Sequence, residues 1–369
     1  MRIALACPYA FDDPGGVQTH VREQADHLRE RGHEVVVLAP VRGRGVLPGV
    51  RAVGRPVNIP YNASNAPIDP RPWSVRRVAA EFAAFGPQIV HVHEPLTPST
   101  SMWATFAAKV PVVATFHSGA ERARLYDLSA PLLRIAARRI AIKIAVSETA
   151  AASARRRIGG YFEIVPNGTD VERFATAHPA DLGPGTKVLF VGRLDERKGF
   201  PVALEAFERL AADRPDLHLV VIGDGPDRAS VSGLSADLRS RVHLLGAIPN
   251  IDLPPYHAAC DMYLGTAVGG ESFGMVLVEA MAAGLPVVAS RIPGYTEVVR
   301  GDVDGLLVPP RDPVAAALAV ARILDDPHLA QRLRAAGLDR ARSFDWAGVI
   351  ERLERLYERA AGQPPTQIP

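Results

Sequence analysis

The sequence predicts an α/β protein made of two Rossmann-like domains, each with a doubly wound parallel sheet. Apolar, strand-like segments alternate with amphipathic, helix-like segments, and this rhythm stops once and then begins again. The length agrees, because 369 residues are more than one hydrophobic core usually supports. We therefore expect two cores, each formed by a parallel sheet that helices cover.

The first half begins with a predicted strand at residues 3–6, which an amphipathic helix at 17–31 follows. Gly32 ends this helix, as a glycine just past the last helical turn commonly does. Further strands are predicted at residues 35–38, 89–92, 112–116 and 144–146. This order is typical of βαβ units and of a parallel sheet.

The second half repeats the pattern with a predicted strand at residues 187–191 and a helix at 201–212. Further strands are predicted at residues 217–222, 242–244, 262–264 and 287–289. Residues 175–185 are rich in proline and glycine and read as a linker. The expected division is a first domain at residues 1–175, a second at 186–345, and a terminal helix at 346–369 that crosses back to the first domain.

The composition indicates a soluble, folded protein, with 47% hydrophobic and 22% charged residues. Cys7 and Cys260 lie far apart, each in or beside an apolar run, so we expect two buried free thiols and a cytoplasmic protein. The first apolar run is too short for a secretory signal. Since no stretch of about 18 uninterrupted apolar residues occurs, any membrane contact should be peripheral, on the inner face of the cell membrane.

The two halves differ in charge although the net charge is only +2. Residues 1–180 hold 22 basic and 15 acidic residues, whereas residues 181–369 hold 20 and 25. An anionic partner of the first half is therefore expected, and a nucleic acid is not. Residues 130–143 carry Arg134, Arg138 and Lys143 among apolar residues, which fits either a basic helix on a membrane surface or an interdomain helix with a solvated face.

Ligands of open α/β sheets bind outside the carboxyl ends of the strands, and glycines stand at such a position after the first strand. Gly15 and Gly16 would let a phosphate group approach the backbone and the start of the first helix. Pro-Gly-Gly is also an ordinary tight turn. The spacing Gly-x-Gly-x-x-Gly is absent, which disfavours a dinucleotide cofactor.

Two cations follow the first strand of the second half. Arg193 could bind a diphosphate through its fork of donors, and Lys198 could do so as a mobile point charge. A solvated, charged loop is the alternative reading. The equivalent position of the glycine turn in the first half favours the ligand-binding reading.

A glycine-rich segment at residues 269–274 leads into a predicted helix at 274–283. Glu271 precedes this helix and Glu279 lies about two turns further on. Backbone N–H groups at the helix start suit a phosphate, and carboxylates accept hydrogen bonds from vicinal hydroxyls of a sugar or a ribose. Two carboxylates could also form a glycosidase acid/base pair, but a hydrolase has no use for the diphosphate-binding cations.

No metal site is expected. His91 and His93 would share one face of a strand, but no third ligand with suitable spacing is evident. Asp302 and Asp304 lie between two glycines and read as a surface turn. We therefore expect no metal and no cofactor, with a nucleotide sugar as co-substrate.

The motifs together resemble those of the retaining GT-B glycosyltransferases of family 4. The signature of that family, two glutamates separated by seven residues, occurs here as Glu271 and Glu279, and the likeness extends over nearly the whole chain. Further matching motifs are Pro14-Gly15-Gly16, Phe116-His117, Pro166-Asn167-Gly168, Gly192-Arg193 with Lys198, and Gly270 to Gly274. The resemblance implies the GT-B fold, in which two Rossmann-like domains face each other across a cleft.

Within family 4 the chain most resembles actinobacterial phosphatidylinositol mannosyltransferases, which use GDP-mannose. The resemblance implies that Arg193 and Lys198 neutralise the donor diphosphate, that Glu271 holds the transferred sugar and that Glu279 holds the ribose. His117 would contact the sugar and help catalysis, although a histidine at a strand end is often only a satisfied polar residue. The other implied donor-binding residues are Gly15, Gly16, Ser272, Phe273 and Gly274.

The resemblance also implies an acceptor site that includes Tyr9, Tyr61, Asn62 and Ser64. Relatives carry an arginine that grips the inositol phosphate shortly after the Tyr-Asn pair, where this chain has Pro67; Arg71 is the candidate substitute. An anionic membrane lipid is the expected acceptor. A soluble acceptor, such as an inositol or a thiol precursor, and a nucleotide-sugar-binding protein without catalysis remain alternatives.

Overall fold

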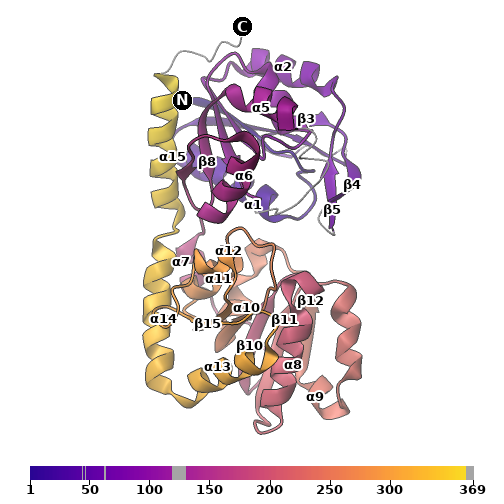
Figure 1. Ribbon diagram of the computed structural model, residues 1–369, viewed down its shortest axis with the longest axis vertical. Coiled ribbons are helices and arrows are strands. Elements are labelled where there is room, and N and C mark those ends of the chain that lie inside the picture. Colours follow the sequence, from indigo (N-terminus) through magenta and orange to yellow (C-terminus); the bar gives the residue numbers. More distant parts are fainter. Residues whose placement is uncertain (44, 46, 62–63, 119–129, 363–369) are drawn as a thin grey trace. The chain divides into compact units, whose positions relative to one another are not determined.

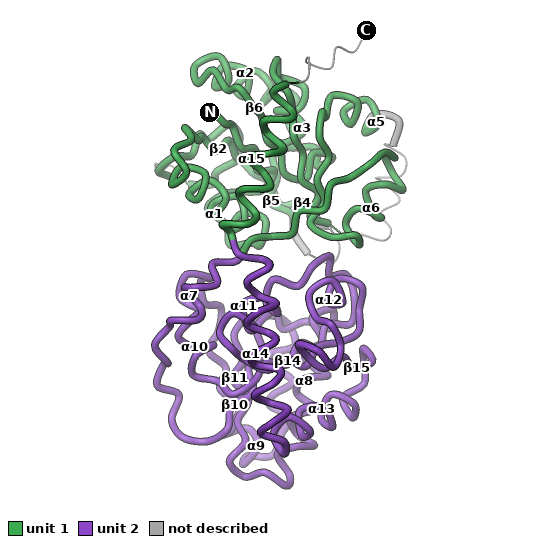
Figure 2. The backbone as a smooth tube through the Cα atoms, turned by 90° about the vertical axis from the view of Figure 1, so that its left-hand side faces the viewer, with its two compact units in different colours: residues 1–168, 346–369 green, residues 169–345 purple. Residues whose placement is uncertain are grey.

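The computed structural model describes residues 1–43, 45, 47–61, 64–118 and 130–362, which form two compact units (Figure 2). Unit 1 comprises Met1–Gly168 and the chain from Trp346 onward, and unit 2 comprises Thr169–Asp345. The chain thus enters unit 2 at Thr169, before the boundary that the sequence suggested at residue 175. The segment 175–185, interpreted above as a linker, belongs to unit 2.

Unit 1 is built on a seven-stranded sheet in the order β3-β2-β1-β6-β7-β8-β9, whose paired strands are all parallel. Its strands are β1 (Arg2–Ala6), β2 (Glu34–Pro40), β3 (Val50–Gly54), β6 (Ile89–His93), β7 (Val112–Phe116), β8 (Ile140–Ala145) and β9 (Glu163–Ile164). A separate antiparallel hairpin consists of β4 (Val57–Tyr61) and β5 (Ser64–Ile68). The described helices are α1 (Gly16–Glu30), α2 (Ser74–Phe85), α3 (Thr100–Ala107), α5 (Ala130–Arg138), α6 (Glu148–Ile158) and α15 (Trp346–Ala361).

The last helix, α15, is part of the core of unit 1 (Figure 1). Trp346 and Tyr357 are buried on its inner face, and the Tyr357 hydroxyl accepts a hydrogen bond from Gln24 of α1 at 2.9 Å. Glu354 accepts one from His33 at 2.9 Å. Burying this amphipathic face gives the sheet of unit 1 a cover that comes from the far end of the chain.

Unit 2 contains a six-stranded parallel sheet in the order β12-β11-β10-β13-β14-β15. Its strands are β10 (Thr186–Val191), β11 (Leu217–Ile222), β12 (Val242–Gly246), β13 (Met262–Gly265), β14 (Val287–Ser290) and β15 (Leu306–Val308). Its helices are α7 (Val171–Ala175), α8 (Phe200–Ala211), α9 (Ala236–Ser240), α10 (Pro254–Ala258), α11 (Met275–Ala282), α12 (Pro293–Thr296), α13 (Pro313–Asp325) and α14 (Pro327–Arg342), with short 3₁₀ turns η1 (Glu196–Lys198), η2 (Pro226–Gly233) and η3 (Asn250–Asp252). The prediction of two doubly wound α/β sheets is therefore confirmed.

One predicted element is wrong. The basic helix expected over residues 130–143 ends at Arg138, and β8 begins at Ile140. Ile140, Ile142 and Ile144 are buried at a period of two, which fits a strand and places Lys143 on the alternate face. The expected free thiols are confirmed, since Cys7 and Cys260 are both buried and unbridged.

Candidate active site

The conformation of the loop after β10 is fixed by one of its side chains, Asp195, and by a glycine, Gly199. Asp195 accepts a hydrogen bond from the backbone N–H of Lys198 at 2.9 Å and so caps η1. Gly199 follows with φ +72°, and a Cβ atom there would overlap the carbonyl oxygen of Thr266, just after β13. Only glycine allows this close approach, which fixes the backbone that carries Lys198.

Two of the predicted donor-binding residues meet directly in an ion-pair network of unit 2. Glu271 Oε1 lies 2.9 Å from Lys198 Nζ and 2.6 Å from Arg197 Nη1. Burial would raise the pKa of the Glu271 carboxyl, but the two cations outweigh it and hold that pKa below its usual value. The carboxylate is therefore ionised at neutral pH. Arg197 was missed by the sequence reasoning, which assigned a role on this loop only to Arg193 and Lys198.

Arg193 occupies a more open position on the same loop. Its Nε lies 3.2 Å from Asp195 Oδ2, and its side chain is 44% exposed. From this position the guanidinium can reach an anionic ligand, while the Asp195 carboxylate, which also caps η1, orients its Nε. Lys198, at 18% exposure, is the more enclosed of the two expected diphosphate-binding cations.

The start of α11 has the tight backbone that the glycine-rich segment predicted. Gly274 precedes the first helical residue with φ +119°, a conformation that side chains rarely adopt. A Cβ atom on Gly294, in α12, would overlap the carbonyl oxygen of Glu271, so the segment before α11 packs closely against α12. The Phe273 ring is buried and meets Phe344 edge-on, so its side chain anchors this segment rather than facing a ligand. Ser272 lies beside it, half-buried.

Glu279 is buried in the middle of α11 and is oriented by residues from two other elements of unit 2. Its Oε1 accepts a hydrogen bond from Asn250 Nδ2 at 2.7 Å. The Oδ1 of Asn250 in turn accepts one from Arg173 Nη2 at 2.8 Å. Neither Asn250 nor Arg173 carries a local sequence signal, because the contacts bridge segments that are distant along the chain.

In unit 1, the two glycines at the start of α1 differ in their surroundings. A Cβ atom on Gly15 would overlap the Gln18 side chain, whereas one on Gly16 would meet no atom of the described residues within 4 Å. The space beside the Gly16 backbone, at the start of α1, is therefore open, which would allow a phosphate to approach. Gly15 is closed off by its own helix.

His117 directly follows β7 and is held by two neighbours. Its backbone N–H donates to Glu94 Oε1 at 2.6 Å, and its Nε2 lies 2.9 Å from His93 Nδ1. Burial lowers the pKa of the His117 ring to about 4, against a smaller raising effect of a hydrogen bond with Asn167. The ring is thus neutral at pH 7 and can accept or donate a hydrogen bond.

The structure describes the predicted acceptor site only in part. Asn62 lies outside the described residues, and Tyr61 and Ser64 are described only as backbone partners that close the β4–β5 hairpin. Tyr9 forms an isolated bridge with Ile68, which attaches the loop after β1 to this hairpin.

Arg71 and Arg42, two arginines close to the hairpin, have different partners. Arg71 Nε lies 2.6 Å from Asp69 Oδ1, and the same guanidinium donates to the Arg55 carbonyl, so it is tied back. Arg42 instead contacts the Asn58 side chain, and Asn58 is the cross-strand partner of Pro67. Arg42 therefore reaches the strand pair that contains Pro67, although its Nε also pairs with an aspartate, Asp13, at 2.8 Å.

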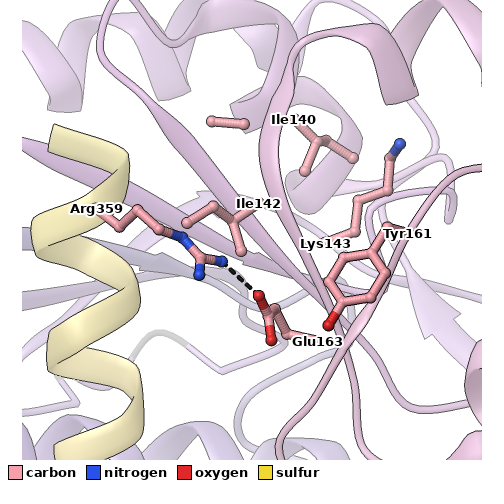
Figure 3. Close-up of a pocket in the computed structure, with 7 residues that line it drawn as sticks. Ile140, Ile142, Lys143, Tyr161, Glu163 and Arg359 are labelled. Atoms are coloured by element: carbon pink, nitrogen blue, oxygen red, sulfur yellow. Dashed lines mark hydrogen bonds and ion pairs between the residues drawn. The ribbon is translucent and has the colours of Figure 1, made fainter. Parts of the chain in front are cut away.

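A pocket of about 380 Å³ lies elsewhere in unit 1, beside the edge of the sheet (Figure 3). It contains none of the predicted site residues. An ion pair between Arg359 and Glu163, at 2.6 Å, crosses it. Its lining consists of Ile140, Ala141, Ile142, Lys143, Tyr161, Glu163 and Arg359.

Asp302 and Asp304, which have the spacing of a metal-binding carboxylate pair, lie in a turn, as predicted, but the Asp304 side chain points inward. Gly301 and Gly305 form a bridge around it. Asp304 is fully buried and accepts hydrogen bonds from the backbone N and the Nε of Arg300, at 2.6 and 2.5 Å. This carboxylate stabilises the turn.

Comparison with known proteins finds family matches that together extend over most of both units. Residues 14–173 match the family Glycosyltransferase Family 4, and residues 177–340 match the family Glycosyl transferases group 1. Phosphatidyl-myo-inositol mannosyltransferase of Mycobacterium tuberculosis is 40% identical over 370 residues, which cover 98% of each chain. The chain belongs to this family of glycosyltransferases.

Two more distant similarities extend the comparison. A D-inositol 3-phosphate glycosyltransferase of Xylanimonas cellulosilytica is 28% identical over 398 residues, covering 96% of this chain and 94% of the relative. The solved structure of HepE from Anabaena in complex with UDP superposes with a TM-score of 0.78 at 21% identity, covering 97% of this chain and all of that one. The latter likeness confirms the GT-B fold.

Proposed function

We propose that the protein transfers mannose from GDP-mannose to a phosphatidylinositol-type lipid, with retention of the anomeric configuration and without a cofactor beyond the nucleotide sugar. The observation that carries this proposal is the Glu271 carboxylate, held between Lys198 and Arg197 before the start of α11. Full-length identity of 40% to phosphatidyl-myo-inositol mannosyltransferases supports the sugar and the acceptor.

The cations of unit 2 have a clear physical task in such a reaction. When the bond between the anomeric carbon and the diphosphate oxygen breaks, negative charge grows on the leaving group, and fixed donors lower the barrier by meeting it there. Lys198 and Arg193 are the proposed donors. Glu271 would accept hydrogen bonds from the hydroxyls of the transferred sugar, and Glu279, oriented by Asn250, from the ribose.

The surface of unit 1 supports a peripheral contact with an anionic membrane on the cytoplasmic side. Trp73, at the start of α2, is 63% exposed, and Arg76 and Arg77 are exposed on the first turn of the same helix. An exposed indole ring beside cations is suited to the interface of an anionic bilayer. Within the described residues, the structure contains no helix with the length and apolarity to span a membrane.

A soluble polyol phosphate is the second candidate acceptor. Pro67 stands where the family resemblance leads us to expect a cation for the lipid headgroup, and Arg71 is engaged by Asp69. A relative at 28% identity is named as a D-inositol 3-phosphate glycosyltransferase. The acceptor experiment therefore has to compare both.

The test is release of GDP from GDP-mannose by the purified protein with phosphatidylinositol vesicles, with inositol 3-phosphate, and with neither. Acceleration and mannolipid formation with vesicles alone are expected. Acceleration by inositol 3-phosphate alone would show that the second candidate is the acceptor. If neither compound accelerates GDP release, the proposed function is refuted.

Arg193→Ala should separate turnover from binding in the same assay. We expect the turnover number to fall about a hundredfold, since one transition-state donor contributes about 3 kcal/mol, with a smaller change in donor affinity. The matched control is Arg311→Ala, which removes an exposed guanidinium that pairs with Glu196 at 2.8 Å. A large loss of GDP-mannose affinity at unchanged turnover would contradict the assigned role.

A further inference from the structure

Three histidines from separate elements of unit 1 meet in its interior. His20 lies in α1, His93 ends β6, and His117 follows β7. One ring nitrogen of each lies within 4.8 Å of a ring nitrogen of both others, and all three side chains are buried. The sequence reasoning rejected a metal because no third ligand accompanied His91 and His93, but the fold brings His20 and His117 to His93.

Two of these rings each have one nitrogen atom without a hydrogen-bond partner in the described part of the chain. Among the residues that the structure describes, His20 Nδ1 and His93 Nε2 are buried and have no hydrogen-bond partner. Buried polar atoms in folded proteins are nearly always paired, so each unpaired atom needs an explanation. A ligand that accepts electron pairs from imidazole nitrogens would provide one.

We infer that His20, His93 and His117 form a binding site for a divalent transition-metal ion of the zinc type. The donor set consists of imidazole nitrogens, which suit Zn²⁺ and its neighbours, whereas Mg²⁺ and Ca²⁺ require oxygen ligands. Zinc–nitrogen bonds of about 2.0–2.1 Å need the three nitrogens to be about 3.4 Å apart, so the rings must close by up to about 1.4 Å. Three protein ligands leave a fourth position for water.

The neighbours of the three rings fit such a site. His93 Nδ1 and His117 Nε2 share a hydrogen bond at 2.9 Å. A metal bound at Nε2 of both rings would take the place of this bond, and no proton is lost if each ring then carries its proton on Nδ1. Asn167 lies beside the His117 ring, and its Oδ1 is buried without a geometric hydrogen-bond partner among the described residues. That oxygen can accept the N–H that a metal-bound ring presents on its other nitrogen.

Occupancy of this site would oppose the transfer reaction. This step rests on the proposed function, in which His117 contacts the sugar. A ring that binds a metal through one nitrogen and Asn167 through the other has no nitrogen left for a hydroxyl group. Zinc should therefore act as a reversible inhibitor, and a chelator should restore activity.

The test is a titration of the full chain, free of affinity tags and stripped with a chelator, with Zn²⁺ and with Co²⁺. We expect one Zn²⁺ per chain and, for Co²⁺, the intense visible absorption of a four-coordinate site, abolished by added Zn²⁺. His20→Gln and His93→Gln should each weaken metal binding by at least about a hundredfold. This is more than the loss of a residue that only hydrogen-bonds a metal ligand usually costs. The matched control is His218→Gln, which alters a close histidine pair in unit 2 (3.0 Å to His243) and should leave binding unchanged.

The inference is overturned if no stoichiometric binding occurs, or if His20→Gln binds both metals as tightly as the wild type, which would indicate adventitious surface binding only. If His93→Gln fails to fold by circular dichroism, His20→Gln and the Co²⁺ spectrum of the wild type decide. Metal binding is measured without any sugar substrate. A failure of the mannosyl-transfer assay would therefore refute the proposed function and leave this inference to its own result.

Discussion

Replacing Glu271 by glutamine tests the donor site most directly, because it removes a charge and keeps the shape. In the protein, one carboxylate oxygen serves both Arg197 and Lys198, and its side chain is 13% exposed. Glutamine retains an oxygen that can accept from one cation. The two cations would then face each other without a counter-charge, and Lys198 would be free to turn toward a bound diphosphate.

The magnitude follows from the lost charge. A hydrogen bond to a charged group contributes about 1.5–3 kcal/mol, and one such bond to a sugar hydroxyl, taken as about 2 kcal/mol, corresponds to a loss of about 30-fold in kcat/KM. The stability effect should be smaller, near 1 kcal/mol, because Arg197 is 37% exposed and solvent screens its charge. GDP, which has no sugar, should bind as tightly as before or up to about tenfold more tightly, since Lys198 no longer has a competing anion.

The assay combines steady-state GDP release with calorimetric titration of GDP into the wild type and Glu271→Gln. Glu196→Gln is the matched control, because Glu196 directly precedes Arg197 in η1, is 76% exposed and pairs only with the exposed Arg311 in the described contacts. A variant that merely unfolds locally would lose affinity for GDP together with activity. The reasoning is refuted if Glu271→Gln keeps kcat/KM within twofold, or if GDP affinity and kcat/KM fall in parallel.

Three further results are expected. Arg42→Ala should raise KM for the lipid about tenfold or more, because Arg42 contacts the hairpin at Asn58 and its partner Asp13 is 27% exposed. Arg71→Ala should change this KM less, because Arg71 is held by Asp69, which is only 2% exposed, and by the Arg55 carbonyl; equal effects in vesicle assays would contradict this. Asn250→Ala should raise KM for GDP-mannose several-fold at nearly constant kcat, as expected for loss of uniform binding, and an unchanged KM would argue against an orienting role. Acidification should destabilise unit 1, because burial holds the pKa of His117 near 4 and that of His91 near 3. Unfolded histidine titrates near 6.5, so the unfolded state binds protons first as the pH falls. The free energy of unfolding should therefore be at its full value above pH 6.5 and lower by about 2 kcal/mol per ring at pH 5. A melting temperature that is constant from pH 7.5 to 5 would disprove the acid effect.

The central strands and the glycine turns could be predicted because their signals are local. The segments 112–116 and 217–222 are apolar apart from one residue each, Thr115 and His218, and the structure forms strands over the same residues. Such runs need no information from elsewhere in the chain, since strands buried on both faces of a parallel sheet are apolar throughout. The start of β8 was missed because Arg134 and Arg138 made the preceding segment look helical beyond its end, while the alternation from Ile140 onward was the stronger physical signal.

The partners that complete each site could not be predicted, because tertiary structure creates them. Asn250 reaches Glu279 from η3, and Arg42 reaches Asn58 from the end of β2. Nothing at these positions distinguishes them from ordinary loop residues. A spacing rule can find two histidines on one strand, but not a third that a helix supplies from seventy residues earlier in the chain.

The pairing of Glu271 with Lys198 and Arg197 also bears on how the proposed enzyme would choose its donor. Without ligand, the carboxylate satisfies the cations, and a free sugar would have to compete with both for it. A diphosphate brings its own negative charge to the cations and so releases the carboxylate for the sugar hydroxyls. Sugar binding and diphosphate binding should therefore be coupled, and by linkage each should strengthen the other. We expect free mannose to bind measurably only when GDP is present, and raised ionic strength to weaken this coupling because it screens the half-exposed cations. Calorimetric titration of mannose with and without GDP measures the coupling, and equal affinities in both would show that Glu271 binds the sugar independently of the cations.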